Sequence, residues 1–203
     1  MGCVNTLILK KLQHGVKYYY SKYFRKLIFY EGEKLAVKVL IENEYIQIIY
    51  TEKQDIPFIV ETEQNQENAE YVAHWSFELH ENALSDTDIL HLIFKNVDGQ
   101  NIGYAIIKGI TNQNDSIELM RMVIVNKGRG YGKIALSLIK KWCFEVKKAH
   151  RLWLDVKDFN VRAQHVYETQ GFIREGVLRE CIKVGDTYQS LVVMSILNQS
   201  YHL

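Results

Sequence analysis

Apolar and polar positions predict that the middle of the chain forms a strand, a turn and a helix in immediate succession. Residues 117–125 are mostly apolar, which is typical of a buried strand. From Tyr131 onward, apolar side chains recur at helical spacing, at Ile134, Leu138, Trp142 and Val146. The pattern therefore changes from the period of a strand to that of a helix across a short glycine-rich stretch.

Pairs of predicted strands and further helical stretches surround this unit. Because strand pairs lie before and after a strand–helix–strand–helix core, the sequence predicts an α+β fold, a mixed sheet with helices on its faces. Before the core we expect two strands within 33–49, a helix from Pro57 to about Gln64, another helix from Asn68 to Leu84, and a hairpin of 89–94 and 102–107 around Asp98-Gly99. After the central helix we expect a buried strand at 151–156, a helix following Asn160, and a closing hairpin of 172–184 and 188–196 around Gly185-Asp186.

The turn before the central helix carries glycine at every second residue, at Gly128, Gly130 and Gly132. Glycines let a ligand approach the main chain closely, and the first turn of a helix has N–H groups without partners and a partial positive charge. We therefore expect an anion site with a pyrophosphate as its ligand. Three basic residues add positive charge around it: Lys127, Arg129 and Lys133.

Two common phosphate-binding motifs do not fit this turn. A P-loop requires Ser or Thr after the Gly-Lys pair, where this chain has Ile134, and no Gly stands where a P-loop would start. A dinucleotide-binding motif requires a later third glycine and an acidic residue on a second strand, and the spacing here provides neither.

The turn resembles instead the acyl-CoA loop of the GNAT N-acyltransferase superfamily: Gln or Arg, two residues, Gly, one residue, then Gly or Ala. Here Lys127 replaces the Gln or Arg, and the loop continues through Tyr131 to Gly132. The resemblance implies that the main-chain amides of this loop bind acetyl-CoA. It also implies that the strand before the loop offers backbone groups to the pantetheine, because the central strands splay apart there in this family. The strand residues concerned are Met122, Val123 and Val125.

A second signature that is similar to one of the same family follows at the expected distance. It consists of Asn160, Ala163, Tyr167 and the pair Gly171-Phe172. Asn160 is expected to cap the helix that follows and, by the resemblance, to contact the cofactor. The resemblance extends over roughly residues 45–197 by element order and is closest from Glu118 to Phe172. It implies the GNAT acyl-CoA N-acyltransferase fold, with a mostly antiparallel mixed sheet and helices on both faces.

Tyr167 is the residue that we expect to act in catalysis, because in this family the corresponding Tyr contacts the thioester sulfur and is the usual acid. A phenol with a pKa near 10 protonates a thiolate near 8.5 only at a cost of about 2 kcal/mol. Hydrogen bonding to the leaving sulfur and full proton transfer therefore both stay open.

Two carboxylates are the candidate general bases. Asp155 precedes Tyr167 by twelve residues, which is similar to the base-to-acid spacing of the ribosomal-protein N-terminal acetyltransferase branch, where the base is Glu. The shorter Asp side chain favours a bridging water. Glu118 lies early in the central strand. Either carboxylate has a structural alternative, a pairing with Arg121 or Arg151, and for Glu118 this alternative is favoured.

These observations predict an N-acetyltransferase that moves the acetyl group of acetyl-CoA to a primary amine by direct attack, since no Cys or Ser lies in a nucleophile pattern. The order of elements is most similar to the branch of ribosomal-protein N-terminal and spermidine N-acetyltransferases. A polyamine, an aminoglycoside-like amine and a protein N-terminus stay open as acceptors. The alternative is a non-catalytic acyl-CoA-binding regulatory or scaffold protein.

Composition bounds the setting of this activity. The 203 residues are 47% hydrophobic, enough for one packed domain with an extension. The three scattered cysteines argue for a reducing compartment and against a disulfide framework or a zinc site, and no stretch predicts a membrane span or a signal peptide. We therefore expect a cytoplasmic protein. His74 and Glu78 share a helix face, but no third metal ligand is indicated, so no metal is expected.

The first 38 residues differ in charge from the rest. They hold eight Lys or Arg against Glu31 and Glu33, a charge of +6, so the remainder of a chain with net charge +1 carries −5. Aromatic residues interleave with these charges, which predicts a basic amphipathic N-terminal extension (1–38), in helical form, ahead of the domain at 39–203. A ribosome, a membrane surface and the protein's own domain all stay open as its partner, as does a homodimer; no nucleic acid is expected. Gly2 and Cys3 allow lipid anchoring only in a eukaryotic source.

Overall fold

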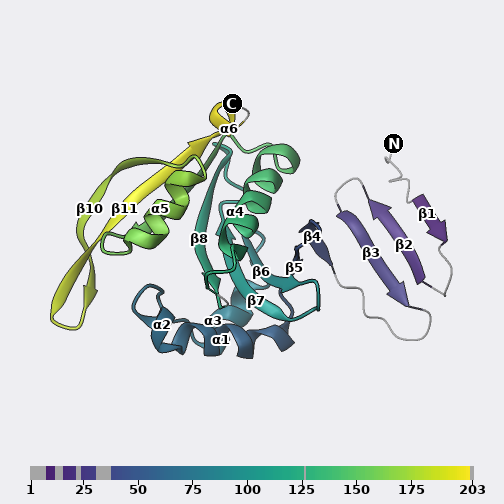
Figure 1. Cartoon of the computed structure of the whole chain (residues 1–203), viewed down its shortest axis with the longest axis horizontal. Coiled ribbons are helices and arrows are strands. Elements are labelled where there is room, and N and C mark those ends of the chain that lie inside the picture. Colours follow the sequence, from purple (N-terminus) through teal and green to yellow (C-terminus); the bar gives the residue numbers. More distant parts are fainter. Residues whose placement is uncertain (1–7, 12–15, 22–23, 31–37, 126, 202–203) are drawn as a thin grey trace.

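The structure, a computed structural model, describes residues 8–11, 16–21, 24–30, 38–125 and 127–201 (Figure 1). Its main sheet has eight strands in the order β10-β11-β9-β8-β7-β6-β5-β4. These strands are β4 (Val39–Glu42), β5 (Ile46–Tyr50), β6 (Ile89–Asn96), β7 (Asn101–Lys108), β8 (Ser116–Ile124), β9 (Arg151–Lys157), β10 (Ile173–Val184) and β11 (Thr187–Leu197). The helices are α1 (Ile56–Gln64), α2 (Gln66–Ala69), α3 (Phe77–Ala83), α4 (Tyr131–Lys141), α5 (Val161–Thr169) and α6 (Asn198–Tyr201), with a 3₁₀ turn η1 (Lys53–Asp55) and a π turn η2 (Trp142–Val146).

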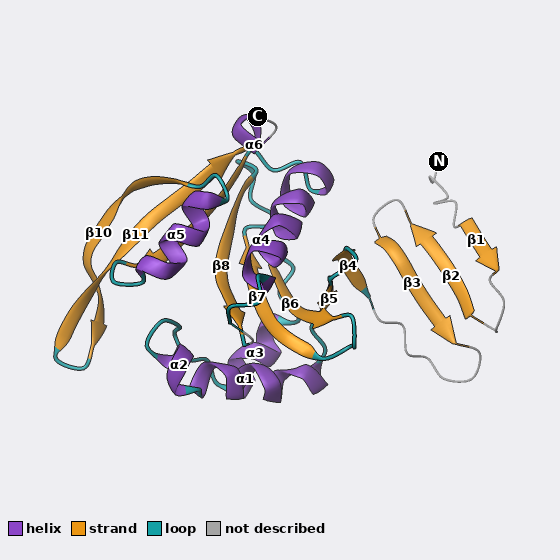
Figure 2. Ribbon diagram, viewed as in Figure 1, coloured by secondary structure: helices purple, strands orange, loops and turns teal. Residues whose placement is uncertain are grey.

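Helices cover both faces of this mixed sheet, as the sequence predicts (Figure 2). On one face, α1 and the segment between α2 and α3 pack against a cluster that includes Tyr104, Ile106 and Val123. On the other face, α4 and α5 pack against a larger cluster. The predicted hairpins at β6–β7 and β10–β11 are present. None of the helices in the described part of the chain combines the length and the apolar character needed to cross a membrane.

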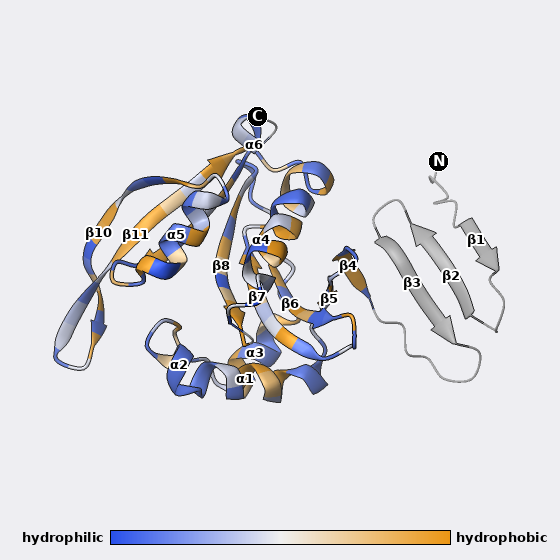
Figure 3. Cartoon of the chain, viewed as in Figure 1, coloured by the Kyte–Doolittle hydropathy of each residue, from blue (hydrophilic) through white to orange (hydrophobic). Residues whose placement is uncertain are grey.

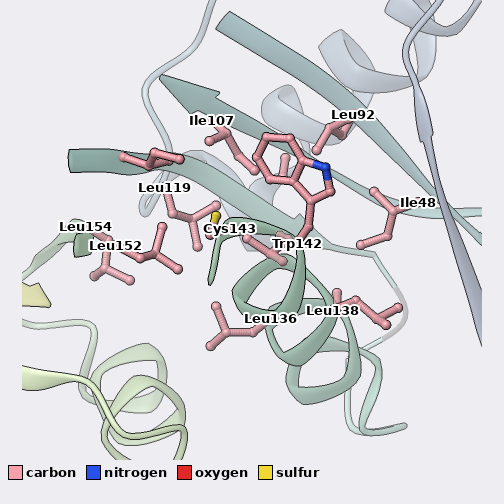
Figure 4. Packing of buried hydrophobic residues seen from close by; sticks show 14 of the residues in the cluster. Ile48, Leu92, Ile107, Leu119, Leu136, Leu138, Trp142, Cys143, Leu152 and Leu154 are labelled. Carbon is pink, nitrogen blue, oxygen red and sulfur yellow. The ribbon is translucent and has the colours of Figure 1, made fainter. Parts of the chain in front are cut away.

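The buried side of α4 holds the larger cluster together. Leu136 of α4 and Cys143 of the following η2 are fully buried there against strand residues such as Leu119 and Leu154 (Figure 4). Ile139 of α4 is fully buried as well. Burying a side chain such as Leu or Ile contributes about 1.5 to 3 kcal/mol, so this face fixes the helix on the sheet. The predicted apolar stripe does not extend through Val146, which is 46% exposed because the last turn is a π turn that rotates the side chains.

Two predicted helices are wrong. The stretch 68–84 is not one helix, because Ser76 caps a new one: its side chain accepts a hydrogen bond from the Leu79 amide at 3.3 Å, and α2 has already ended at Ala69. Residues within 1–38 form strands rather than a helix: β1 (Ile8–Lys11), β2 (Val16–Ser21) and β3 (Phe24–Tyr30) pair in an antiparallel sheet of their own. The aromatic and apolar residues of this stretch favour strands. Residues 1–7, with Gly2 and Cys3, lie outside the described residues.

The pairing of β8 with β9 determines where the sheet opens. All neighbouring strands of the main sheet are antiparallel except β8 and β9, which are parallel. Their register extends only from Ser116 opposite Arg151 to Glu118 opposite Trp153. Beyond these residues the two strands part in the described structure, toward the ends from which the glycine turn and α5 follow.

The edge strand β10 is irregular. Its pairing with β11 shifts between Arg174 and Gly176, and again between Leu178 and Ile182. Within the second shift Glu180 has a φ of 50°, in the left-handed region. The outer side of the sheet therefore ends in a strand that is bulged twice.

A buried group of polar residues, here called the Glu63 cluster, joins α1 and α3 to the sheet. Glu63 is fully buried on α1, and its carboxylate accepts hydrogen bonds from Tyr104 Oη at 2.6 Å and from Arg121 Nη1. His80 Nε2 of α3 lies 3.4 Å from Glu63 Oε1, and His80 Nδ1 lies 2.9 Å from His91 Nε2. The cluster thus replaces hydration for several buried polar groups at once.

The pKa values of Glu63 and His91 in this cluster differ strongly from those in an unfolded chain. Burial by itself raises the pKa of Glu63, but the contacts of His80 and Tyr104 and the charge of Arg121 outweigh it and lower the pKa to about 2. Burial, followed by the neighbouring His80, lowers the pKa of His91 to about 3. At neutral pH the cluster therefore holds an ionised Glu63 and a neutral His91.

We predict that acid destabilises the fold through this cluster. Below pH 6.5 an unfolded chain protonates His91 while the fold does so only near pH 3, so stability falls by about 1.4 kcal/mol per pH unit in that interval. Glu63 adds a similar loss from pH 4.5 down to about 2. Urea denaturation as a function of pH measures this. His91→Asn flattens the slope between pH 6.5 and 4.5; an unchanged slope contradicts the prediction.

Candidate functional site

A cavity of about 770 Å³ lies where β8 and β9 part. Its walls come from α2 and the residues after it, the end of β8, the glycine turn with the start of α4, and α5. The cavity gathers ten of the fourteen site residues predicted from the sequence: Met122, Val123, Lys127, Gly128, Gly130, Tyr131, Gly132, Lys133, Asn160 and Tyr167. Val125, Arg129, Asp155 and Glu118 are not among the lining residues.

The glycine turn has the backbone geometry that an anion site needs. Gly128 and Gly130 have φ of 84° and 78°, a region that favours glycine, and no atom lies within 4 Å of the place where a Cβ would stand. The N–H groups of residues 128–132 donate to no backbone acceptor among the described residues. The amides of Lys133 and Ile134 instead donate to the Gly130 carbonyl, so of the predicted row of amides Lys133 contributes only its side chain.

The basic residues around the turn have different surroundings. Lys127 Nζ lies 3.0 Å from the Glu67 carbonyl and 3.2 Å from Glu67 Oε2, so the turn is tied to α2 by an ion pair. Lys157, at the end of β9, donates to the Glu70 carbonyl at 2.7 Å just after α2. These two lysines therefore hold α2 and the residue after it at the opening between β8 and β9. The helix itself is largely hydrophilic (Figure 3).

Tyr167 lies on the inner side of α5, where its ring contacts that of Phe172 with centroids 5.8 Å apart. Burial, and next the nearby charge of Asp155, raise the pKa of Tyr167 to about 12. The hydroxyl is therefore protonated at every physiological pH and acts as a hydrogen-bond donor. Asn160 caps the same helix as predicted: its side chain accepts from the Ala163 amide at 3.1 Å.

The two predicted carboxylates lie together on the sheet, outside the cavity lining. Asp155 extends from the same face of β9 as Trp153, which is the residue opposite Glu118 on β8. Burial raises the pKa of Asp155, and burial followed by the charge of Asp155 raises the pKa of Glu118. Both carboxylates thus hold their protons more strongly than exposed ones do.

Neither carboxylate has the arginine partner of the structural alternative. Arg121 pairs with Glu63, and Arg151 pairs with Glu175 at 2.6 Å. Among the described residues no side-chain hydrogen bond or ion pair to Asp155 or Glu118 is present. A half-buried carboxylate without a donor is an unusual arrangement in a fold, and it is typical of sites where a proton or a cation is handled.

Several lining residues have no counterpart in the sequence expectations. They come from α2 and its C-terminal side and from the first turns of α5: Gln66, Glu67, Asn68, Glu70, Tyr71, Val72, Arg162 and Val166. Asn65 is the signal that could have located α2, because it caps that helix by accepting from the Glu67 amide at 2.9 Å. Its position over the cavity depends on contacts distant in sequence, such as Lys127 with Glu67.

Comparison with known proteins gives consistent results. Residues 49–172 match the model of the "Acetyltransferase (GNAT) family". Spermidine N(1)-acetyltransferase of Vibrio cholerae serotype O1 is 30% identical over 76 residues, which cover 37% of this chain and 44% of that protein. The chain therefore matches less than half the length of this curated relative.

Solved structures share the fold. The crystal structure of spermidine N-acetyltransferase from Vibrio cholerae in complex with CoA and spermine has a TM-score of 0.72 at 24% identity, covering 79% of this chain and all of that one. A dodecameric structure of the same enzyme has a TM-score of 0.68 at 24% identity, covering 78% of this chain and 97% of that one. At this identity the likeness concerns the fold.

We predict opposite effects for alanine at two glycines of the turn. Gly130→Ala places a Cβ at a φ of 78° and lowers the free energy of unfolding by about 1 kcal/mol. Gly132→Ala is the matched control: its φ is ordinary, its Cβ meets only Ile124 Cγ1 at 3.7 Å, and alanine in a helix stabilises by about 0.5 to 1 kcal/mol. Chemical denaturation measures both; equal effects contradict the geometry of the turn.

Proposed function

The chain belongs to the acetyltransferase (GNAT) family, and from this premise we propose that it is an N-acetyltransferase that transfers the acetyl group of acetyl-CoA to a primary amine. The observation that carries the proposal is the row of N–H groups at residues 128–132, which have no backbone acceptor among the described residues and belong to a turn that lines the opening between β8 and β9. Such a row at a helix start suits a diphosphate, and the cavity volume of about 770 Å³ lies within the range of cofactor sites.

The residues present fit coenzyme A. The amides of the glycine turn suit its diphosphate, and Lys133 and Arg162 line the same cavity with positive charge. Met122 and Val123 line it at the end of β8, where no strand pairs with them on the β9 side. The main-chain groups of that strand end are the partners that we propose for the pantetheine amides. The bound cofactor supplies an acetyl group on a thioester whose sulfur leaves as a thiolate.

Tyr167 stabilises the leaving sulfur by hydrogen bonding rather than by giving up its proton. With its pKa raised to about 12, proton transfer to a thiolate of pKa near 8.5 is uphill by about 4 to 5 kcal/mol. A hydrogen bond from Oη needs no such transfer and acts on the charge that develops as the bond to sulfur breaks. The structure thus favours one of the two roles left open by the sequence.

Asp155 is the base that we propose for the amine. An alkylamine with a pKa near 10.4 is protonated at pH 7, so one proton must leave its nitrogen before that nitrogen bonds to the acetyl carbon. Because the pKa of Asp155 is raised, it lies nearer to the pKa of the amine. Because Asp155 does not line the cavity, the proton travels through a water molecule. Burial causes the rise in the pKa of Asp155, and burial followed by the charge of Asp155 in turn raises the pKa of the neighbouring Glu118.

A polyamine is the acceptor that we propose. Residues 39–203 carry the −5 charge, and the cavity has the acidic rim residues Glu67 and Glu70. The net negative charge of this part of the chain raises the concentration of a cationic substrate near the protein. The relative of known structure, described as bound to CoA and spermine, is consistent with this class of acceptor. For the basic segment 1–38 we propose attachment to a larger anionic surface.

The proposed function predicts stabilisation by the cofactor and release of thiol. Coenzyme A at a hundred times its Kd stabilises the fold by about 2.7 kcal/mol, which thermal melting detects. Acetyl-CoA with a panel of polyamines, aminoglycosides and N-terminal peptides releases free thiol fastest with a polyamine. Tyr167→Phe and Asp155→Asn slow turnover at least tenfold.

Tyr188→Phe is the matched control, since Tyr188 is 58% exposed on the closing hairpin and is absent from the cavity lining. Its turnover equals that of the unmodified chain. An absence of any melting shift at millimolar ligand overturns the proposal. A shift without thiol release from every amine selects the alternative, a non-catalytic acyl-CoA-binding protein.

The ion pair between Lys127 and Glu67 predicts the sign of a change in affinity. Because Glu67 brings a negative charge to a lysine beside the phosphate site, Glu67→Gln tightens CoA binding about two- to fivefold, as expected from an exposed pair. Glu61→Gln on the exposed side of α1 is the control and leaves the Kd unchanged. Isothermal titration measures each Kd. When Lys127 is replaced by Met, Glu67→Gln improves the affinity for CoA by a smaller factor. An improvement of equal size would mean that the effect of Glu67→Gln does not come from its pairing with Lys127.

A further inference from the structure

Glu63 contacts two segments that each include or adjoin residues lining the cavity. Its Oε2 accepts a hydrogen bond from the Trp75 amide at 2.8 Å, at the end of the segment 70–76, whose first residues line the cavity. Its Oε1 accepts from Arg121, which directly precedes the lining residues Met122 and Val123 on β8. One fully buried carboxylate therefore connects segment 70–76 with the end of β8.

Arg121 reaches Glu63 because β8 contains a bulge. Arg121 lies opposite Ile106 and Leu119 lies opposite Ile107, so Met120 is an extra residue on β8. Before the bulge, the odd-numbered Ile117 and Leu119 belong to the cluster under α4, whereas Val123 after it belongs to the cluster under α1. The bulge thus reverses which residues face α1, and it sends Arg121 to Glu63.

The contact is shielded from water and specific in geometry. The Arg121 side chain is 6% exposed and its guanidinium lies 4.8 Å from the centre of the Trp75 ring. A buried ion pair of this kind adds little net stability compared with apolar residues of the same volume, but loss of one partner leaves an uncompensated charge. Its value to the protein must then lie in the arrangement that it imposes.

We propose that Glu63 is a positioning residue for acetyl transfer: by holding Arg121 and the Trp75 amide, it fixes the β8 bulge and segment 70–76 relative to each other. The main chain of Met122 and Val123 and segment 70–76 then keep a fixed separation across the cavity. The kinetic part of this inference rests on the proposed function. The geometric part does not, because the separation is a property of the fold.

Three variants test it: Glu63→Gln, Arg121→Met and the double variant Glu63→Gln/Arg121→Met. Each single variant is expected to melt lower, since it leaves one buried group without its partner, and the double variant to regain most of the loss. Ile46→Ala is the control of stability alone, because Ile46 is buried on β5 in the larger apolar cluster and belongs neither to the Glu63 cluster nor to the cavity lining.

Hydrogen exchange measured by mass spectrometry gives the first readout. In the double variant, peptides covering 70–76 and 119–125 exchange at least tenfold faster than in the unmodified chain, although its melting temperature has recovered, while peptides of α4 are unchanged. Ile46→Ala shows no such local effect at matched stability. Unchanged exchange in the two segments of the double variant overturns the inference whether or not the protein is an acetyltransferase.

Kinetics give the second readout. In the double variant kcat falls at least tenfold, whereas the Kd for CoA rises by a smaller factor, because the glycine turn proposed for the diphosphate is intact. Ile46→Ala keeps both values. Recovery of kcat together with stability assigns Glu63 a purely structural role and also overturns the inference. Failure of the proposed function is seen separately, as an unmodified chain that neither binds CoA nor releases thiol.

Discussion

The parting of the parallel strands β8 and β9 is the constraint on which the rest of the structure depends. Main-chain N–H and C=O groups inside a protein need partners, and a fully paired sheet would provide them. Here the shared register ends at Glu118 and Trp153, so the strand ends beyond have main-chain groups available to a ligand. The glycine turn, α4 and α5 all begin at these ends, and α2 lies across them. The site is therefore a consequence of an interrupted sheet rather than a hollow added to a complete one.

Local sequence patterns predicted the parts of the fold and site that depend on neighbouring residues. The two hairpins, the central strand and helix, the Asn160 cap and the glycine turn each depend on a spacing within a few residues. The family resemblance located the two motifs, and the cavity contains ten of the residues that they indicated. The turn also shows the limit of this approach, since the Lys133 amide bonds back to Gly130.

What the sequence did not reveal depends on residues distant along the chain. Glu63 meets Tyr104 and Arg121 across separations of 41 and 58 residues, and Lys127 meets Glu67 across 60. No periodicity records such contacts. The same limit explains the error at 68–84, where helical propensity continues but the Trp75 amide is bound by Glu63 outside any helix. At the N-terminal stretch, the interleaved aromatic and basic residues predicted an amphipathic helix, but the stretch forms strands, which aromatic residues also favour.

The twice-bulged strand β10 has a consequence for how copies of this protein behave when crowded. A long, straight outer strand offers a ladder of unpaired amides and carbonyls to any other extended chain, which is the usual route to runaway fibre growth. Kinks at residues 174–176 and 178–182 break that ladder into short, twisted pieces. Exposed apolar side chains there, such as Leu178 at 50%, can thus remain on the surface without recruiting neighbours strand by strand. The two bulges of β10 therefore hinder the addition of another strand to this edge of the sheet.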